Sequence, residues 1–118
     1  MIHHYEDTDV EDLVLRLQGA IEEINSQNYD SAMLELRRLE ASSIRQISVR
    51  ARFYMGEVLF LQSEYDLAMQ AFEGILKRDA FSGLVLKTLD RLITCSDELG
   101  LEGKRNQYYS LLHDFFES

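Results

Sequence analysis

The residue types that most often carry proton transfer or metal chemistry are thinly spread along this chain. His3 and His4 are adjacent near the N-terminus, and His113 stands beside Asp114 far from them. Adjacent side chains do not face each other on a helix, so neither pair predicts an acid–base couple. No cysteine or suitably spaced carboxylate completes a metal-ligand set around His3 and His4. We therefore expect a solvated tail there, no metal site, no catalytic site and no cofactor.

The single cysteine, Cys95, cannot form a disulfide within the chain. It falls in a helical apolar pattern without a basic neighbour, so we expect a small buried thiol. Acidic residues crowd the stretch from Glu6 to Asp12, and the partial positive charge of a helix N-terminus explains them. The sequence has no glycine-rich phosphate loop, nucleophile elbow or well-spaced carboxylate pair. These observations predict that the chain is not an enzyme.

An internal repeat organises the chain. Residues 28–33 read Asn-Tyr-Asp-Ser-Ala-Met, and residues 64–69, 36 positions later, read Glu-Tyr-Asp-Leu-Ala-Met. The same offset relates three further pairs: Ala20 and Gly56, Leu36 and Phe72, and Leu39 and Ile75. The match therefore extends through a unit of two helices. A period in this range is typical of stacked helical hairpins.

Apolar residues at steps of three and four predict six helices. The spacing of Thr8 and Glu11 fits a capping box, which places the first helix start at Thr8. The other helices are expected around Met33, Leu36 and Leu39, from about Ser48 to Leu61, from about Tyr65 to Lys77, around Leu84, Leu86, Leu89, Leu92 and Ile93, and around Tyr108 and Leu111. The chain has no proline, so helix is favoured throughout and we expect almost no strand.

Residues 52–80 resemble one full unit of the tetratricopeptide repeat family. The matching positions are Gly56 at the helix crossing, Leu59 in the first helix, and Tyr65, Ala68, Phe72 and Ile75 in the second. A small crossing residue lets two helices approach, while the larger residues fill the space between hairpins. The upstream copy repeats the scheme at Ala20, Tyr29, Ala32, Leu36 and Leu39.

The resemblance implies an all-α, right-handed α-solenoid of three helix-turn-helix repeats with six helices. We expect one domain over residues 1–118, with repeats at about 13–47, 48–82 and 83–118. The first copy departs from the family at Glu23, where an apolar residue is expected. The third departs at Asp90 and Lys104, which replace small residues, and we expect a connection about two residues longer there, absorbed by Gly100 and Gly103.

In this family the first helix of each hairpin lines a concave surface that commonly holds a peptide of another protein. The resemblance places a partner-binding groove at Arg50, Phe53, Tyr54, Glu57 and Phe60, with Lys87, Thr88 and Arg91 in the third repeat. The alternative is that the aromatic residues of this set pack against neighbouring helices, although at least one should stay accessible. The lysine and asparagine clamp with which some members grip chaperone C-termini has no counterpart here. We expect an amphipathic helix or peptide as the ligand.

The C-terminal helix suggests a second surface. Repeat arrays need a polar cap over the last hairpin, yet the sequence ends with Leu112, Phe115 and Phe116 close together and no amphipathic helix after them. An exposed apolar patch usually marks an interface. These three residues therefore predict self-association as a homodimer, or continuation into a longer stack.

Charge and composition narrow the partners. The chain of 118 residues has 12 basic and 21 acidic residues, a formal charge of -9, which repels phosphate backbones and anionic lipid headgroups. No apolar run reaches membrane-spanning length, and residues 1–12 lack the pattern of a signal peptide, so we expect neither nucleic acid nor membrane insertion and a cytoplasmic location. The sequence predicts a protein-interaction module, an adaptor or scaffold. The alternatives are a self-assembling unit and a noncatalytic regulatory domain of a longer protein.

Overall fold

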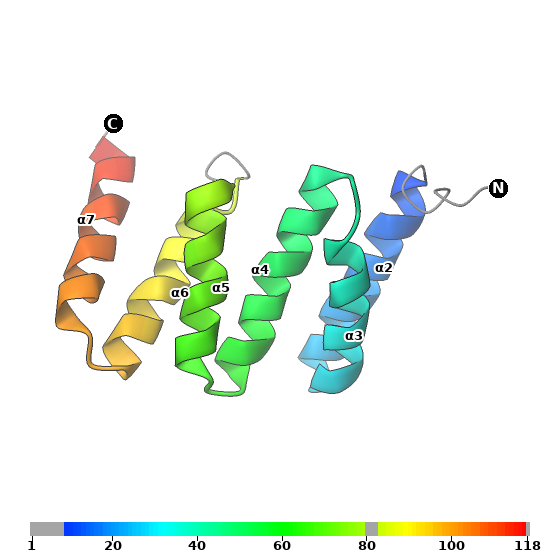
Figure 1. The fold of residues 1–118 in the computed structure, drawn as a ribbon, viewed down its shortest axis with the longest axis horizontal. Coiled ribbons are helices and arrows are strands. Elements are labelled where there is room, and N and C mark those ends of the chain that lie inside the picture. The colour runs from blue at the N-terminus through cyan, green and yellow to red at the C-terminus, as the bar shows by residue number, and fades with distance from the viewer. Residues whose placement is uncertain (1–8, 80–82, 118) are drawn as a thin grey trace. The chain divides into compact units, whose positions relative to one another are not determined.

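The computed structural model describes residues 9–79 and 83–117. Over these residues the chain is all-helical and contains no strand, as the sequence predicted (Figure 1). The six helices of this described part are α2 (Val10–Asn25), α3 (Tyr29–Glu40), α4 (Arg45–Leu61), α5 (Tyr65–Arg78), α6 (Val85–Glu98) and α7 (Glu102–Glu117). Thus the helix number and class are confirmed for the described residues.

The chain divides into two compact units, Met1–Val58 and Leu59–Ser118. The division falls near the end of α4, so the first unit holds α2, α3 and most of α4, and the second holds α5, α6 and α7. The expected single domain of three repeats stays a prediction.

The core of the first unit forms between α2 and α3, which lie side by side, and is completed by α4 (Figure 1). Its buried residues are Leu13, Leu17, Ala20, Ile24, Ala32, Leu36, Leu39, Ile47, Ala51 and Val58. Those of α2 recur at steps of three and four, so the helix buries one stripe and leaves the opposite side in water. The α2 helix is therefore amphipathic, with its apolar stripe in the core.

Two helix starts differ from the prediction. The cap of α2 is Asp9, whose carboxylate accepts a hydrogen bond from the Asp12 amide at 3.1 Å, while Thr8 lies outside the described residues. Aspartate is preferred over threonine as an N-cap residue, and Asp9 is one residue closer to the apolar stripe. In addition, α4 begins at Arg45, ahead of the predicted Ser48, because the Ile44 carbonyl already accepts from the Ser48 amide at 3.0 Å.

The three hairpins use the same three-residue turn, at 26–28, 62–64 and 99–101. The middle residue has a positive φ in each: 65° at Gln27, 62° at Ser63 and 71° at Gly100. The amide after it returns to a carbonyl five residues back, at 2.8 Å from Asn28 to Glu23, 2.9 Å from Glu64 to Leu59, and 2.8 Å from Leu101 to Ser96. This is the Schellman pattern of helix termination.

The shared turn corrects the expectation for the third repeat. Its turn is no longer than the others, and Gly103 lies inside α7. The extra length instead precedes α6, where residues 79–84 join two helices, whereas residues 41–44 do so between α3 and α4. In this chain the three turns have equal length, and the added residues lie in the connection between hairpins.

In the second unit α6 packs against both α5 and α7 (Figure 1). The buried residues are Ala68, Met69, Phe72 and Ile75 of α5, Leu89, Leu92 and Cys95 of α6, Leu84 just before α6, and Tyr108 of α7. The burial of Cys95 confirms the expected buried thiol. Since Tyr108 is the one buried residue of α7, the other large apolar side chains of that helix lie at or near the surface.

Candidate functional site

The predicted groove residues of the first unit separate by exposure. Arg50 is exposed, and Tyr54 and Glu57 are half-buried. Phe53 is only 3% exposed, so it is not the accessible anchor that was expected. It follows Val49 by one helical turn on the buried side of α4, and its ring meets the edge of Tyr54 at 5.3 Å between centroids. Phe53 is therefore a packing residue, as the alternative interpretation held.

The predicted groove residues of the second unit also separate. Phe60 is half-buried, Lys87 is exposed, and the Arg91 side chain is 31% exposed. Thr88 was expected on the same surface, but it is fully buried. It lies on the α6 stripe that continues one turn later to Leu92, so the helix turns it inward.

Arg91, Phe60 and Tyr65 form an aromatic–arginine cluster in the second unit. The guanidinium carbon of Arg91 lies 4.5 Å from the Phe60 ring centroid, and the Phe60 and Tyr65 rings meet edge to face at 5.7 Å. Lys87 is one turn before Arg91 on α6, which puts both cations on the same side of that helix. Two of the predicted groove residues, Phe60 and Arg91, are thus in contact.

The cluster gives Arg91 a fixed position. A cation over an aromatic face is attracted by about 0.5–1 kcal/mol at an exposed site. The Asp90 carboxylate lies 3.8 Å from Arg91 Nη1, and the Asp90 side chain is 74% exposed, so this ion pair contributes little. A stacked guanidinium presents its N–H donors at the edge of its plane, the geometry that matches a carboxylate. This arrangement places the guanidinium of Arg91 against an aromatic surface.

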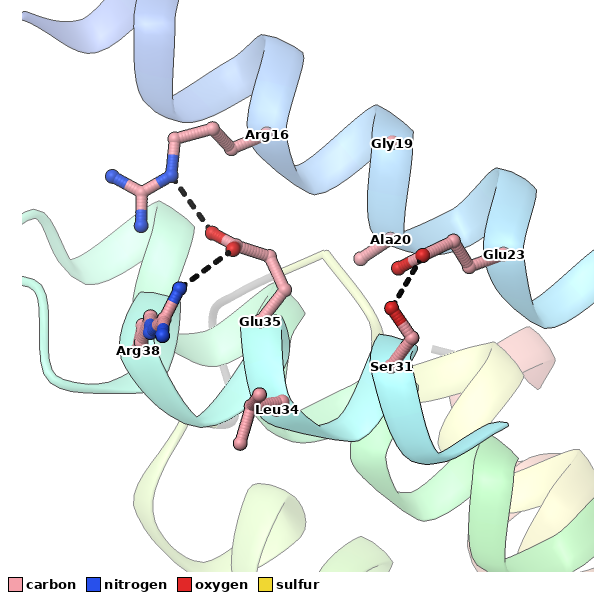
Figure 2. A pocket seen from close by; sticks show the side chains of 8 residues that line it. All are labelled: Arg16, Gly19, Ala20, Glu23, Ser31, Leu34, Glu35 and Arg38. Atoms are coloured by element: carbon pink, nitrogen blue, oxygen red, sulfur yellow. Dashed lines mark hydrogen bonds and ion pairs between the residues drawn. The ribbon is translucent and has the colours of Figure 1, made fainter. Parts of the chain in front are cut away.

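A shallow hollow of about 420 Å³ opens between α2 and α3 in the first unit (Figure 2). At one end Arg16 Nε lies 2.7 Å from Glu35 Oε2, and Arg38 Nη1 lies 3.6 Å from Glu35 Oε1. At the other end the Ser31 hydroxyl donates to Glu23 at 2.5 Å. Glu35 is therefore engaged by two arginines and Glu23 by a serine, while Gly19, Ala20 and Leu34 add apolar surface to the lining.

This hollow explains the departure at Glu23. An apolar residue was expected at that position, yet the carboxylate is half-buried and hydrogen-bonded to Ser31. Two positions are matched between the copies: where the first hairpin has Glu23 and Ser31, the second has Leu59 and Leu67 at the same 36-residue offset. The first hairpin thus carries polar side chains where the second carries apolar ones.

A polar cluster that sequence analysis missed joins α5 and α7. Lys104 Nζ lies 2.8 Å from Glu73 Oε2, and the Tyr108 hydroxyl donates a hydrogen bond to the same oxygen. Burial alone would raise the pKa of Glu73, but the hydrogen bonds from Lys104 and Tyr108 and the charges of Lys104 and Lys77 lower it below its ordinary value. Burial, together with the bond to Glu73, raises the pKa of Tyr108 well above its ordinary range.

The signal for this cluster was present at Lys104. Lysine stands there in place of a small residue, and its side chain reaches Glu73 on α5. The cluster holds two helices together, and its carboxylate is already engaged by two donors. We therefore interpret it as structural.

Within residues 9–79 and 83–117, no group of three or more histidine, cysteine or acidic side chains is placed to hold a metal ion. His3 and His4 lie outside these residues. His113 Nε2 lies 3.6 Å from Glu117 Oε2, one turn later on α7, and both side chains are exposed. In the part of the chain that is described, no helix has the length and apolar character needed to cross a membrane.

The predicted self-association residues lie on the surface of α7. Phe116 is 73% exposed, Phe115 is about half exposed, and Leu112 is half-buried. Leu112 and Phe116 border a shallow hollow whose other lining residues are Tyr109, Ser110 and His113. The structure thus brings two of the three predicted residues to one hollow on a single helix.

Neither a protein-family model, nor a curated protein, nor a solved structure matches this chain. The resemblance to the tetratricopeptide repeat therefore rests on the residues of the repeat itself.

Proposed function

We propose that this chain is a protein-interaction module, a right-handed stack of three tetratricopeptide-like hairpins that acts as an adaptor or scaffold. The 36-residue repeat of Tyr-Asp-x-Ala-Met supports the proposal. So does the recurrence of one Schellman turn in all three hairpins, because a repeated supersecondary unit is the basis of such stacks. The module has no catalytic role and requires no cofactor.

The observation that carries the proposed binding role is the aromatic–arginine cluster of Phe60, Tyr65 and Arg91. Arginine and aromatic residues are enriched among the residues that dominate binding energy at protein interfaces. Here the guanidinium stands over the Phe60 ring and is partly exposed, with Lys87 one turn away. These two cations lie together in a chain whose formal charge is -9.

This chemistry defines the ligand. The cluster suits an amphipathic segment of another protein that offers a carboxylate to Arg91 or Lys87 and an apolar side chain to the rings. A partner of this kind binds through an apolar contact that supplies affinity and a charge pair that supplies orientation. An amphipathic helix presents both groups on one face when they are three or four residues apart.

Peptide selection tests the proposal directly. The immobilised chain is used to select from a displayed random peptide library, and the selected peptides are measured by fluorescence anisotropy. We expect them to carry carboxylates and apolar residues at helical spacing. Phe60→Ala combined with Arg91→Glu should weaken their binding by at least about tenfold while leaving the helical circular dichroism unchanged.

Matched changes elsewhere serve as the control. Leu34→Ala and Arg37→Glu remove an exposed apolar side chain and reverse an exposed positive charge on α3. They should leave peptide binding unchanged. If the selected peptides bind the cluster variant and the wild type equally well, the cluster is not the binding site. A separate Tyr54→Ala variant tests the predicted groove residues of the first unit.

A further inference from the structure

Two apolar positions recur in the second helix of every hairpin. They appear when the hairpins are aligned on the turn residue with a positive φ, which is Gln27, Ser63 or Gly100. Nine positions after this residue stand Leu36, Phe72 and Tyr109, and twelve positions after it stand Leu39, Ile75 and Leu112. Because the two positions are three residues apart, they share one side of their helix.

In the first two hairpins a following helix completes the burial of these positions. Leu36 and Leu39 are completely buried in a core to which α4, the first helix of the next hairpin, contributes buried residues. Phe72 and Ile75 are also completely buried, and α5 packs against α6, which is again the first helix of the next hairpin. The chain thus contains two examples of the kind of helix that covers this side.

On α7 the same two positions are open. Tyr109 is 51% exposed and Leu112 is half-buried. Both line a shallow hollow of about 480 Å³, which Phe116 also borders one turn later. Tyr108 faces inward instead, since its hydroxyl reaches Glu73 on α5. We call the surface of Tyr109, Leu112 and Phe116 the α7 face, and by alignment it is the side that a following helix covers in α3 and α5.

We propose that the α7 face is a second docking site, for an amphipathic helix of a partner protein that begins with lysine or arginine and packs on α7 as α6 packs on α5. The proposal rests on the equivalence of the three hairpins. It is independent of the peptide-binding role of the aromatic–arginine cluster, because it uses no residue of that cluster.

The end of α7 favours a partner helix that begins with cations. The last turns of α3 and α5 each carry two basic residues, whereas the last turn of α7 carries none and includes Asp114 and Glu117. Glu117 lies 3.6 Å from His113. Only residues 41–44 separate α3 from α4, and residues 79–84 separate α5 from α6, so each covering helix begins near the end of the helix it covers. A partner helix in the same position would place its first turn beside Asp114 and Glu117, where lysine or arginine is complementary.

The first turns of the helices in this chain separate a partner helix from a second copy. Arg45 and Lys87 are in the first turns of α4 and α6, and neither turn has an acidic residue. The first turn of α2 carries Glu11 and Asp12. A second copy stacked head to tail would bring this acidic turn of α2 to the acidic end of α7. Charge therefore favours a helix of the α4 and α6 type over α2 of a second copy.

The size of the α7 face predicts a weak site. A helix of 16 residues is about 24 Å long. A single helix packed on it buries less than the roughly 800 Å² per partner of a standard stable interface, so the contact is transient. We expect a dissociation constant of roughly 0.1–1 mM for an isolated helix. A partner that is also held elsewhere on the chain gains from the high effective concentration of its second segment.

A helix of the chain itself serves as the probe. The peptide comprises residues 83–99, which include α6, with Cys95→Ala to prevent oxidation. It is titrated into the 15N-labelled full chain, and binding is followed by NMR chemical shifts. We expect the shifts to concentrate around Tyr109, Leu112 and Phe116.

One exposed residue of the α7 face tests the site. Tyr109→Glu should raise the dissociation constant of the peptide by at least about tenfold and keep the wild-type circular dichroism. Leu34→Glu introduces the same charge at a residue on α3 that is 55% exposed, and it should bind as the wild type does. Peptides selected through the aromatic–arginine cluster should bind Tyr109→Glu and the wild type equally, which keeps the two sites separate.

Charge exchange tests the direction of the bound helix. Lys87→Glu combined with Arg91→Glu in the peptide should weaken its binding to the wild-type chain by about threefold or more. Asp114→Lys combined with Glu117→Lys in the chain should restore the binding of this altered peptide. An altered peptide that binds the wild-type chain as the original peptide does would overturn the predicted direction.

Four further results would overturn the proposal. The first is a wild-type chain whose α7 shifts do not respond to millimolar peptide. The second is equal binding by Tyr109→Glu and the wild type. The third is a set of shifts that spreads through α5, which would show that the peptide displaces α6. The fourth is equally tight binding of a peptide of residues 9–26, which include α2, or α7 shifts that depend on the concentration of the chain alone. Either form of the fourth result would assign the α7 face to a second copy.

Discussion

The Tyr108 hydroxyl on α7 donates a hydrogen bond to the carboxylate of Glu73 on α5, although all of α6 separates these helices in the sequence. Lys104 binds the same carboxylate oxygen at 2.8 Å. Tyr108 is also the one buried residue of α7. Its hydrogen bond to Glu73 and the burial of its ring therefore hold the last helix in place. The attachment of α7 therefore depends on a small number of side chains.

Tyr108→Phe should destabilise the chain by about 1.5–3 kcal/mol, the range for a hydrogen bond to a charged group. The change keeps the buried ring and removes only the donor to Glu73. Urea unfolding followed by circular dichroism measures the effect. Tyr29→Phe, the same change at a half-buried tyrosine of α3, is the matched control and should cost less. Equal costs for the two variants would show that the bond to Glu73 contributes nothing specific.

The same cluster predicts a pH dependence. The pKa of Glu73 is lower in the folded chain than its ordinary value, so the folded state favours the ionised carboxylate. Its contribution is complete above the unfolded pKa of about 4.3 and is lost as the pH falls through the folded pKa. The difference in unfolding free energy between the wild type and Glu73→Gln should therefore be constant near neutral pH and shrink on acidification. Urea titrations at several pH values check this, and a difference that grows with acid would contradict it.

The turns predict opposite effects of glycine at matched positions. Gln27 and Ser63 hold a positive φ that favours glycine, whereas Gly100 already supplies it. Gln27→Gly and Ser63→Gly should each stabilise the chain by up to about 1 kcal/mol, since relief of the strained backbone exceeds the added chain entropy. Gly100→Ala should destabilise it by roughly 1–2 kcal/mol. Thermal and urea unfolding measure both effects.

Gly19→Ala is the control for the turn variants. Gly19 is inside α2, its φ is not positive, and an added Cβ would meet no atom within 4 Å. Alanine should therefore stabilise α2 by about 0.5–1 kcal/mol, the opposite sign to Gly100→Ala. If both glycine-to-alanine changes had the same sign, the assigned role of positive φ at the turns would be wrong.

Ala32 requires a small side chain. It is completely buried in the core of the first unit, between α2 and α3, and it is the repeat counterpart of Ala68, which is also completely buried. Ala32→Leu should overpack this core at a cost of roughly 1–3 kcal/mol. Ala41→Leu, at the exposed end of α3, should change the melting temperature little. An unchanged melting temperature for Ala32→Leu would show that the helices do not crowd this position.

The helices could be predicted because their signals are local. Apolar residues at steps of three and four locate α2 to α7, and the repeat of Ala32 as Ala68 locates two buried positions. The third hairpin was harder to predict. The longer connection is the one before α6, whereas Gly100 and Gly103 suggested a longer turn between α6 and α7. The turn of the third hairpin, closed by the hydrogen bond from Leu101 to Ser96, has the same length as the other two.

The candidate site could be predicted only in part, because helical period does not separate the edge of a buried stripe from its centre. Phe53 and Thr88 were predicted to lie on an open surface, but both are buried. Each is adjacent in the sequence to a more accessible residue, Tyr54 and Lys87. Phe60 and Arg91, two of the expected groove residues, are in contact. The bond between Glu73 and Tyr108 joins residues 35 positions apart, and nothing local in the sequence specifies such a pair.

The buried thiol of Cys95 can serve as a native probe of local opening in the second unit. It belongs to the second unit and is completely shielded from solvent, and the chain has no other cysteine. A thiol reagent can modify it only when this unit opens, so the labelling rate under native conditions reports the free energy of that opening. Comparing this value with the global unfolding free energy reveals whether α5, α6 and α7 open alone or together with the rest of the chain. The measurement needs no engineered probe.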